Sequence, residues 1–225
     1  MDSVRDLNDI FAKYPRRIVK KKQIVLSAGE LNNSLYLLES GYISTHLLNY
    51  DGWEFTINIL APGSVFPLTQ VLSDMNTNPH EFKAMTTSAI RIAPTDIVLK
   101  YLDENPTYYT YFARKFAVGI EGLVKRIEYL VRADGVQRVI CAFDLMVKKF
   151  GINNTDGSVT IGFAHTHQDI ADIAGVSRET TSRVLQKLKK MGVIVNRKRM
   201  TQITNPLELN KLLKTEDSDW VGDGL

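Results

Sequence analysis

The sequence predicts an α+β protein with three successive parts: an N-terminal antiparallel β-roll of the cupin-like kind, a long dimerisation helix and a C-terminal winged helix-turn-helix. Three observations support this order. Short apolar clusters separated by glycines come first, a heptad pattern follows, and a helix pair with a glycine turn lies near the C-terminus. The expected boundaries are 1–104 for the β-roll, 105–133 for the helix, 134–213 for the winged helix-turn-helix, and 214–225 for an acidic tail that we expect to be disordered.

Composition places the chain among ordinary globular proteins. Its 225 residues are 44% hydrophobic and 24% charged, enough for one or two domains with a proper core. The longest apolar runs fall short of the roughly 20 residues that a membrane span needs. Met1 is followed by acidic and polar residues, which do not resemble a secretory signal. We therefore expect a cytoplasmic protein without membrane contact.

The β-roll prediction depends on spacing. Apolar clusters recur about every 11 residues and alternate with glycines, a pattern typical of an antiparallel sandwich or barrel, and Asp51-Gly52 is a hairpin-turn signal. The segment 13–22, KYPRRIVKKK, has six positive charges and no negative one. It fits an exposed strand edge or, alternatively, a second contact with nucleic acid.

The heptad pattern begins after Asn105-Pro106, an N-cap followed by proline at the first helical position. About 27 residues at 1.5 Å rise give a rod of roughly 40 Å. We expect a dimer through its apolar seam, and the alternative is a long helix that packs only on its own domain. Asp134-Gly135 breaks the helix as a hinge, and a further helix runs from Val136 to Phe150. The seam residues, spaced 4-3-4-3-4-3, are Tyr109, Ala113, Phe116, Ile120, Leu123, Ile127 and Leu130.

The stretch from Thr166 to Ile194 predicts two short helices joined by a turn. Thr166 and Asp169 have the spacing of a capping box. Gly175 supplies the positive φ that the turn needs, and Ser177 is a good N-cap for the second helix. Apolar residues at helical spacing give each helix one face for the core: Ile170, Ile173 and Ala174 on the first, and Val184, Leu185 and Leu188 on the second.

The charge of this region indicates a DNA-binding surface. From His165 to Arg199 there are eight Lys or Arg and three Asp or Glu, a net charge of +5, whereas the whole chain carries +3. An ion pair between Glu179 and Arg183 is the alternative use of those two side chains. The residues at the positions from which a recognition helix reads base edges are Arg178, Glu179, Ser182 and Arg183.

Short strands flank the helix pair. One is Val159–Ile161, and the segment from Val193 to Thr204 predicts a hairpin with Arg197, Lys198 and Arg199 at its tip. Such a hairpin is the wing of a winged helix, and its basic tip would meet DNA phosphates.

The order of β-roll, long helix and winged helix-turn-helix resembles the Crp/Fnr superfamily of bacterial transcription regulators, the group of the cyclic-AMP receptor protein, over about residues 18–205. Two segments carry the resemblance: KKQIVLSAGELNNSLYLLESGYISTHLLNYDGWEFTINILAPGSVF, similar to the effector-domain glycine framework, and QDIADIAGVSRETTSRVLQKLKKMGVI, similar to the DNA-binding module. The resemblance implies a cyclic-nucleotide-binding-domain-like roll and a homodimer that binds an inverted repeat in double-stranded DNA. It also implies RNA polymerase as a partner if the protein is an activator.

On the same resemblance, Arg178, Glu179 and Arg183 match base-reading positions. The arrangement Glu179…Ser182-Arg183 is similar to the anaerobic (Fnr) branch, which implies TGA-like half-sites. The residues that would contact phosphates are Thr166, His167, Gln168, Ser177, Thr180, Lys187, Arg197, Lys198 and Arg199.

The effector site departs from the family pattern. A cyclic-nucleotide site in this family needs a Gly-Glu pair and then an Arg-Ser or Arg-Thr pair, whereas this chain has Pro67-Leu68 and Asn78-Pro79-His80, with no arginine between Arg17 and Arg91. A phosphate buried without a cation would be costly, so we expect an effector other than cyclic AMP, or none. The expected lining suits a small apolar or aromatic molecule and equally a filled core: Phe66, Leu68, Leu123, Val124 and Ile127.

No enzyme activity, cofactor or metal is expected. His165-x-His167 is not a zinc spacing, and a cupin-like metal site would need more histidines than His46 and His80. His80 could alternatively bind haem. The single cysteine, Cys141, excludes an intrachain disulfide and fits a core position or, alternatively, a redox switch.

Two function classes remain open. One is a dimeric DNA-binding regulator, and the other is a small-molecule-binding module whose helical end mediates protein contacts. The basic wing and the arginine-glutamate-arginine set favour the regulator.

Overall fold

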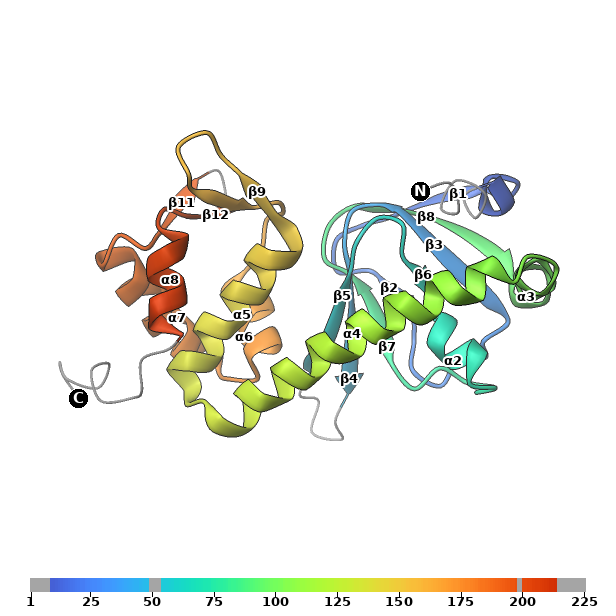
Figure 1. Ribbon diagram of the computed structural model, residues 1–225, viewed down its shortest axis with the longest axis horizontal. Coiled ribbons are helices and arrows are strands. Elements are labelled where there is room, and N and C mark those ends of the chain that lie inside the picture. The colour runs from blue at the N-terminus through green and yellow to red at the C-terminus, as the bar shows by residue number, and fades with distance from the viewer. Residues whose placement is uncertain (1–8, 49–53, 198–199, 214–225) are drawn as a thin grey trace. The chain divides into compact units, whose positions relative to one another are not determined.

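The computed structural model describes residues 9–48, 54–197 and 200–213. The chain divides into two compact units, Met1–Gly122 and Leu123–Leu225, which we describe separately (Figure 1). The first contains two antiparallel sheets with helices, and the second is a helical unit with one small sheet. This arrangement confirms the predicted α+β class. The Asp51-Gly52 turn and the acidic tail lie outside the described residues.

The first unit contains two four-stranded antiparallel sheets. The first has the order β1-β8-β3-β6, and the second has the order β2-β7-β4-β5. The strand bounds are β1 Arg16–Val19, β2 Ile24–Leu26, β3 Ser34–Ser40, β4 Ile43–Leu48, β5 Glu54–Leu60, β6 Val65–Phe66, β7 Glu81–Ala84 and β8 Ser88–Pro94.

Strand β3 separates two apolar clusters because successive side chains point to opposite faces of a strand. Leu38 belongs to a cluster that draws on both sheets and includes Ile43, Phe66 and Phe82. Leu35, on the other face, belongs to a cluster with residues of helices α2 (Leu68–Leu72), α3 (Thr95–Glu104) and α4 (Thr107–Arg132). The glycine spacing reflects tight turns: Gly41 has φ +83°, and a Cβ there would lie 2.7 Å from the carbonyl oxygen of Thr87.

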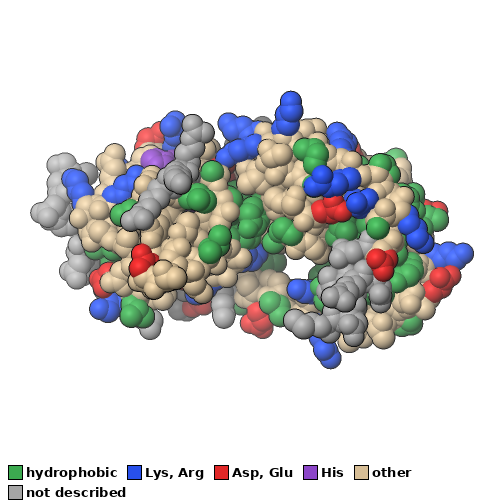
Figure 2. Space-filling model, turned by 90° about the horizontal axis from the view of Figure 1, so that it is seen from above, with side chains coloured by type: hydrophobic (Ala, Val, Ile, Leu, Met, Phe, Trp, Pro, Cys, Tyr) green, Lys and Arg blue, Asp and Glu red, His purple; other side chains and the backbone are tan. Residues whose placement is uncertain are grey.

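The basic segment 13–22 includes β1, which is an edge strand of its sheet. Its six Lys and Arg residues are exposed, and Lys and Arg side chains gather on the upper face of the first unit in Figure 2. Arg16 Nε lies 2.8 Å from Glu39 Oε2, so one of these charges is paired within the β-roll. Positive charge on an edge strand also discourages pairing with another chain.

Helix α4 begins one residue later than the sequence indicated. The side-chain amide of Asn105 donates to the carbonyl oxygen of Tyr101, 2.9 Å away, at the end of α3. Two residues of α4, Tyr108 and Phe112, are buried in the apolar cluster that contains Leu35. Tyr109 and Phe116 of the seam also pack against that cluster, while Ile120, Leu123 and Ile127 are exposed at 60%, 42% and 58%. No described helix is long and apolar enough to span a bilayer.

The second unit is a helical bundle with a four-stranded sheet of order β11-β12-β10-β9. Its elements are α5 Gly135–Phe150, β9 Gly151–Asn153, β10 Val159–Ile161, α6 His167–Ala174, α7 Arg178–Lys190, β11 Ile194–Arg197, β12 Met200–Ile203 and α8 Pro206–Leu212. The strands β11 and β12 form the predicted hairpin, although Lys198 and Arg199 at its tip lie outside the described residues. Helix α8 was not predicted, although Asn205-Pro206 is an N-cap signal and Asn205 Oδ1 accepts from the Glu208 N–H.

The junction between α4 and α5 is capped from both sides. Asp134 Oδ1 accepts a hydrogen bond from the Gln137 N–H at 2.7 Å and so caps α5. The guanidinium of Arg138 donates to the carbonyl oxygens of Ala133 and Leu130 at the end of α4. Gly135 does not have a positive φ, so the break follows from the cap and not from a glycine conformation. The hinge at Asp134-Gly135 stays a prediction.

Candidate nucleic-acid interface

Local hydrogen bonds position helices α6 and α7. Thr166 Oγ1 accepts from the Asp169 N–H at 3.1 Å, and Asp169 Oδ2 accepts from the Thr166 N–H at 2.7 Å, which is a complete capping box. Gly175 ends α6 in the left-handed conformation, with φ +65°. Ser177 Oγ then accepts from the Thr180 N–H at 3.1 Å and begins α7. The capping box, turn glycine and N-cap predicted for this helix pair are confirmed.

Apolar packing fixes one face of each helix in the core of the second unit. Every apolar residue that the sequence assigned to these faces is buried. Thr181 is fully buried among them on α7. With one face of α7 held inside, the side chains on its other face are directed to solvent. The buried residues of the pair are Ile170, Ala171, Ile173, Ala174, Thr181, Val184, Leu185 and Leu188.

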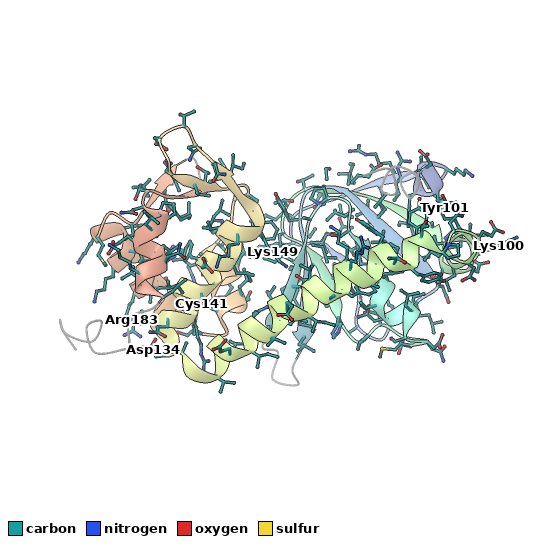
Figure 3. The ribbon with its side chains drawn as sticks, in the orientation of Figure 1. Lys100, Tyr101, Asp134, Cys141, Lys149 and Arg183 are labelled. Carbon is teal, nitrogen blue, oxygen red and sulfur yellow. The ribbon has the colours of Figure 1, made fainter. Side chains whose placement is uncertain are left out.

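The outer face of α7 carries three charged side chains: Arg178, Glu179 and Arg183 are all exposed, and Figure 3 labels Arg183 on this helix. Within the described ranges Arg183 has no ion pair, so the alternative of a Glu179–Arg183 pair is not formed. The pKa of Glu179 is lowered, first by its own backbone N–H, then by the Ser177 side chain and the charge of Arg178. Glu179 is therefore ionised at neutral pH and can accept hydrogen bonds.

Ser182 differs from these three because its hydroxyl has a partner on the other helix. Ser182 Oγ lies 2.8 Å from Nδ1 of His167, the first residue of α6. Burial lowers the pKa of His167, and the charges of Lys189 and Arg178 lower it further. Sequence patterns missed this contact because the two residues are 15 positions apart on different helices.

The other expected phosphate contacts lie at several places. Thr166, Gln168 and Ser177 are exposed at the starts of the two helices, and Thr180 is half-buried beside Ser177. The side-chain amide of Gln168 donates to Asp172 at 2.7 Å. The remaining expected contacts are Lys187 in the last turn of α7, Arg197 in β11, and Lys198 and Arg199 outside the described residues.

The residues expected to line an effector pocket are divided between the two units. Phe66 is buried between the stacked rings of Tyr36 and Phe82, with centroids 5.2 and 4.9 Å away. Leu68 is buried in the other apolar cluster. The remaining three, Leu123, Val124 and Ile127, belong to the second unit and are exposed. A cavity of about 370 Å³ lies elsewhere in the first unit, lined by Asp9, Ala12, Leu37, Leu38, Glu39, Gly63 and Arg91.

The loop at Asn78-Pro79-His80, which stands where the family's cyclic-nucleotide site needs its Arg-Ser or Arg-Thr pair, is engaged in its own hydrogen bonds. Asn78 is fully buried, its amide nitrogen donates to the Ser27 carbonyl at 3.2 Å, and its amide oxygen accepts from the His80 N–H at 3.2 Å. Arg91, the first arginine after this loop, pairs with Glu39 at 2.5 Å and donates to the Tyr14 carbonyl at 2.6 Å.

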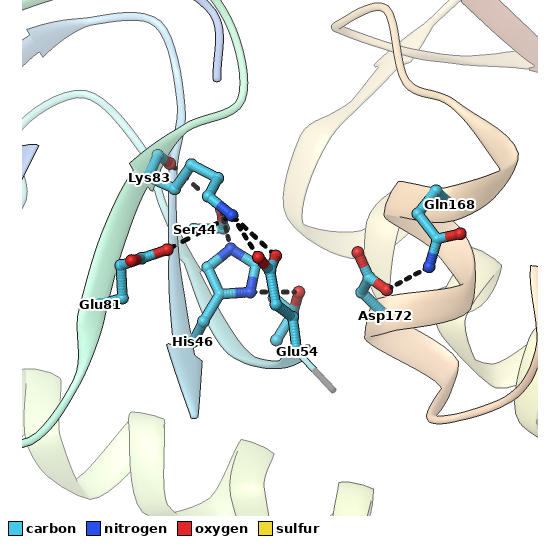
Figure 4. A network of polar contacts seen from close by, with 8 residues as sticks. Ser44, His46, Glu54, Glu81, Lys83, Gln168 and Asp172 are labelled. Carbon is cyan, nitrogen blue, oxygen red and sulfur yellow. Dashed lines mark hydrogen bonds and ion pairs between the residues drawn. The ribbon is translucent and has the colours of Figure 1, made fainter. Parts of the chain in front are cut away.

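A polar network crosses β4, β5 and β7 in the first unit (Figure 4). Lys83 Nζ lies 2.7 Å from Glu54 and 3.3 Å from Glu81, and His46 Nε2 lies 2.6 Å from Ser44 Oγ. Burial lowers the pKa of Lys83, but the bonds to Glu54 and the charge of Glu81 outweigh it and raise the pKa overall. Lys83 therefore stays charged, and its ammonium links β7 to β5.

Cys141 lies on α5 (Figure 3). Burial, followed by the charge of Asp144, raises the pKa of its thiol to about 12. The reactive thiolate is therefore scarce at neutral pH, which does not favour the alternative of a redox switch. Among the residues that the structure describes, no His, Cys, Asp and Glu side chains form a group that could hold a metal ion.

A β-roll joined by a long helix to a helix-turn-helix with an exposed, basic second helix defines a DNA-binding transcription regulator. Residues 16–105 match the family described as cyclic nucleotide-binding domain, and residues 137–212 match the Crp-like helix-turn-helix domain. The chain belongs to the Crp/Fnr superfamily of bacterial transcription regulators.

Named relatives support this assignment. The chain is 25% identical over 193 residues to the global nitrogen regulator of Synechococcus elongatus, covering 85% of this chain and 86% of the relative. It is 26% identical to the lactate racemization regulatory protein of Lactiplantibacillus plantarum, covering 84% and 86%. Its fold is similar to that of FixK2 from Bradyrhizobium japonicum, with a TM-score of 0.76 at 18% identity, covering 88% of this chain and 96% of the other.

Proposed function

We propose that this protein is a homodimeric, sequence-specific regulator that binds an inverted repeat with TGA-like half-sites. The observation that carries the proposal is the exposed set Arg178, Glu179 and Arg183 on the outer face of α7. Arginine donates two hydrogen bonds to guanine O6 and N7, and a carboxylate accepts from cytosine N4. A G·C pair and its neighbours are therefore the natural targets of this set.

The starts of α6 and α7 supply the phosphate contacts in this proposal. Exposed hydroxyl and amide side chains of Thr166, Gln168 and Ser177 lie there, and free N–H groups at a helix N-terminus favour phosphate oxygens. The basic residues of α7 and of the wing would add affinity for any duplex through counterion release.

A dimer through α4 is supported by the exposure of its seam. Ile120, Leu123 and Ile127 expose apolar side chains on one helix face, with nothing in the described chain to cover them. Two such faces bury each other in a parallel coiled coil. A twofold axis along that pair would set the two recognition helices about one DNA turn, roughly 34 Å, apart.

The test is selection of bound duplexes from a random library, followed by binding measurements at several salt concentrations. We expect an enriched inverted repeat with TGA in each half. Enrichment without a repeated half-site would contradict the dimeric mode of binding. Binding to no duplex at low salt would favour a module whose helical end contacts proteins.

Cyclic AMP should not stabilise the protein. Leu68 is a core residue where the family's cyclic-nucleotide site needs the glutamate of its Gly-Glu pair, and Arg91 is already paired with Glu39. A ligand at 100 times its Kd stabilises the folded state by about 2.7 kcal/mol, which would raise the Tm by several degrees. We expect no change in Tm with millimolar cyclic AMP and no heat of binding in calorimetry. A clear shift would show that the nucleotide binds through other residues.

A further inference from the structure

We propose that His167 takes up a proton when α6 meets a DNA phosphate, and that Ser182 positions its imidazole for this contact. The proposal rests on the DNA-binding function proposed above and adds a proton to the binding reaction. It also changes the role of Ser182 from a base-reading residue to a positioning residue.

Of the two ring nitrogens of His167, Nδ1 has a hydrogen-bond partner within the protein, and Nε2 is left for a ligand. His167 Nδ1 lies 2.8 Å from Ser182 Oγ, so a residue of the recognition helix orients the ring of a residue that begins α6. The side chain of His167 is only partly buried. Because Ser182 occupies Nδ1, Nε2 is the nitrogen that can meet a ligand at the start of α6, where the proposed function places a DNA phosphate.

Burial and the neighbouring charges favour the neutral ring of His167 before DNA binds. Burial disfavours the charged ring, and Lys189 and Arg178 on α7 disfavour a further positive charge, so the pKa of His167 lies below its ordinary value of 6.5. On its own helix, the carboxylate of Asp169 is held by the Thr166 N–H. His165 bonds to the Phe163 carbonyl and to Thr201.

A phosphate reverses this balance. Its negative charge offsets Lys189 and Arg178 and favours the imidazolium, whose two N–H groups then donate to Ser182 Oγ and to the phosphate oxygen. The serine hydroxyl can change from donor to acceptor by rotation. The proton comes from solvent, and one is taken up by each subunit.

The sign of the pH dependence follows from linkage. Because the pKa of His167 is higher in the complex than in the free protein, affinity is greatest below the free-state pKa and falls as pH rises through the pKa of the complex. Each unit by which the phosphate raises that pKa contributes about tenfold to affinity per subunit, hence about a hundredfold for a dimer.

The experiment measures Kd by fluorescence anisotropy from pH 5.5 to 8.5, with the selected inverted repeat and with an unrelated duplex at fixed salt. We expect the wild type to bind more weakly as pH rises. His167→Gln should flatten that slope, and His167→Arg should flatten it while binding tightly at pH 8.5. His80→Gln is the matched control, because it removes a partly buried histidine from the β-roll, and it should keep the wild-type slope.

Ser182 variants separate positioning from a merely structural role. Ser182→Ala should reduce the pH slope, and Ser182→Thr, which keeps the hydroxyl, should restore it. If His167→Gln loses the pH dependence of Kd equally on both duplexes, the result supports a phosphate contact. If it loses the pH dependence on the inverted repeat alone, the result would overturn the phosphate contact. An equal pH dependence of Kd in the wild type and in His167→Gln would also overturn the proposal. Specific binding to the inverted repeat would then still support the proposed function. Absence of any preference for the inverted repeat at every pH would instead reject the proposed function.

Discussion

Replacing Ile120 and Leu123 by lysine should give monomers in light scattering at micromolar concentrations. Both side chains are exposed on the α4 seam, at 60% and 42%, so the change should leave the fold of the single chain intact. In a dimer, however, it would bury four ammonium groups between two apolar faces, which is strongly unfavourable. The monomer should also bind the inverted repeat far more weakly than the wild type, since its two half-sites would no longer be bound together.

Val118→Lys is the matched control for this prediction. Val118 is also an exposed apolar residue of α4, at 73%, but it lies outside the heptad seam. The control should remain dimeric and bind DNA normally. A double variant that stays dimeric would place the subunit contact on another surface.

Arg183→Ala should weaken binding to the selected inverted repeat by about 1–3 kcal/mol per half-site, which is roughly 5- to 150-fold. The side chain is exposed and has no ion pair with any other described residue, so its removal costs no described contact within the protein. The loss should be concentrated at one base pair, and competition with each of the four possible pairs there would measure it.

Lys190→Ala is the control for Arg183→Ala. Lys190 is an exposed cation in the last turn of the same helix. Its loss should weaken the specific and the unrelated duplex by similar factors and reduce the salt dependence. If Arg183→Ala behaved in the same way, Arg183 would contact only phosphate.

Short-range sequence signals predicted the DNA-binding helices well. The capping box at Thr166, the left-handed Gly175 and the N-cap Ser177 each depend on residues within a few positions of one another. Their geometry is therefore contained in the local sequence. The start of α4 was less accurate, because the side chain of Asn105 bonds back to the preceding helix.

Contacts between distant segments could not be predicted in the same way. Phe66 and Leu68 have the composition of a ligand pocket and also that of a core, and only the packing of the β-roll distinguishes the two. The pairing of Ser182 with His167 depends on how two helices cross. The seam of α4 contains both packed and exposed residues, since Phe116 packs on the β-roll while Ile127 is exposed. The heptad pattern alone does not distinguish them.

The caps at the α4–α5 junction have a consequence for how such a regulator can change its target. The last turns of α4 belong to the same compact unit as the helix-turn-helix, and Arg126 of α4 donates to the Ile173 carbonyl of α6 at 2.6 Å. In a dimer built through α4, the distance between half-sites is therefore set by α4 and its caps, while the bases within each half-site are read by α7. Substitutions on α7 can thus move the protein to a new operator sequence while the spacer length stays the same. Spacer length and half-site sequence can evolve as independent properties.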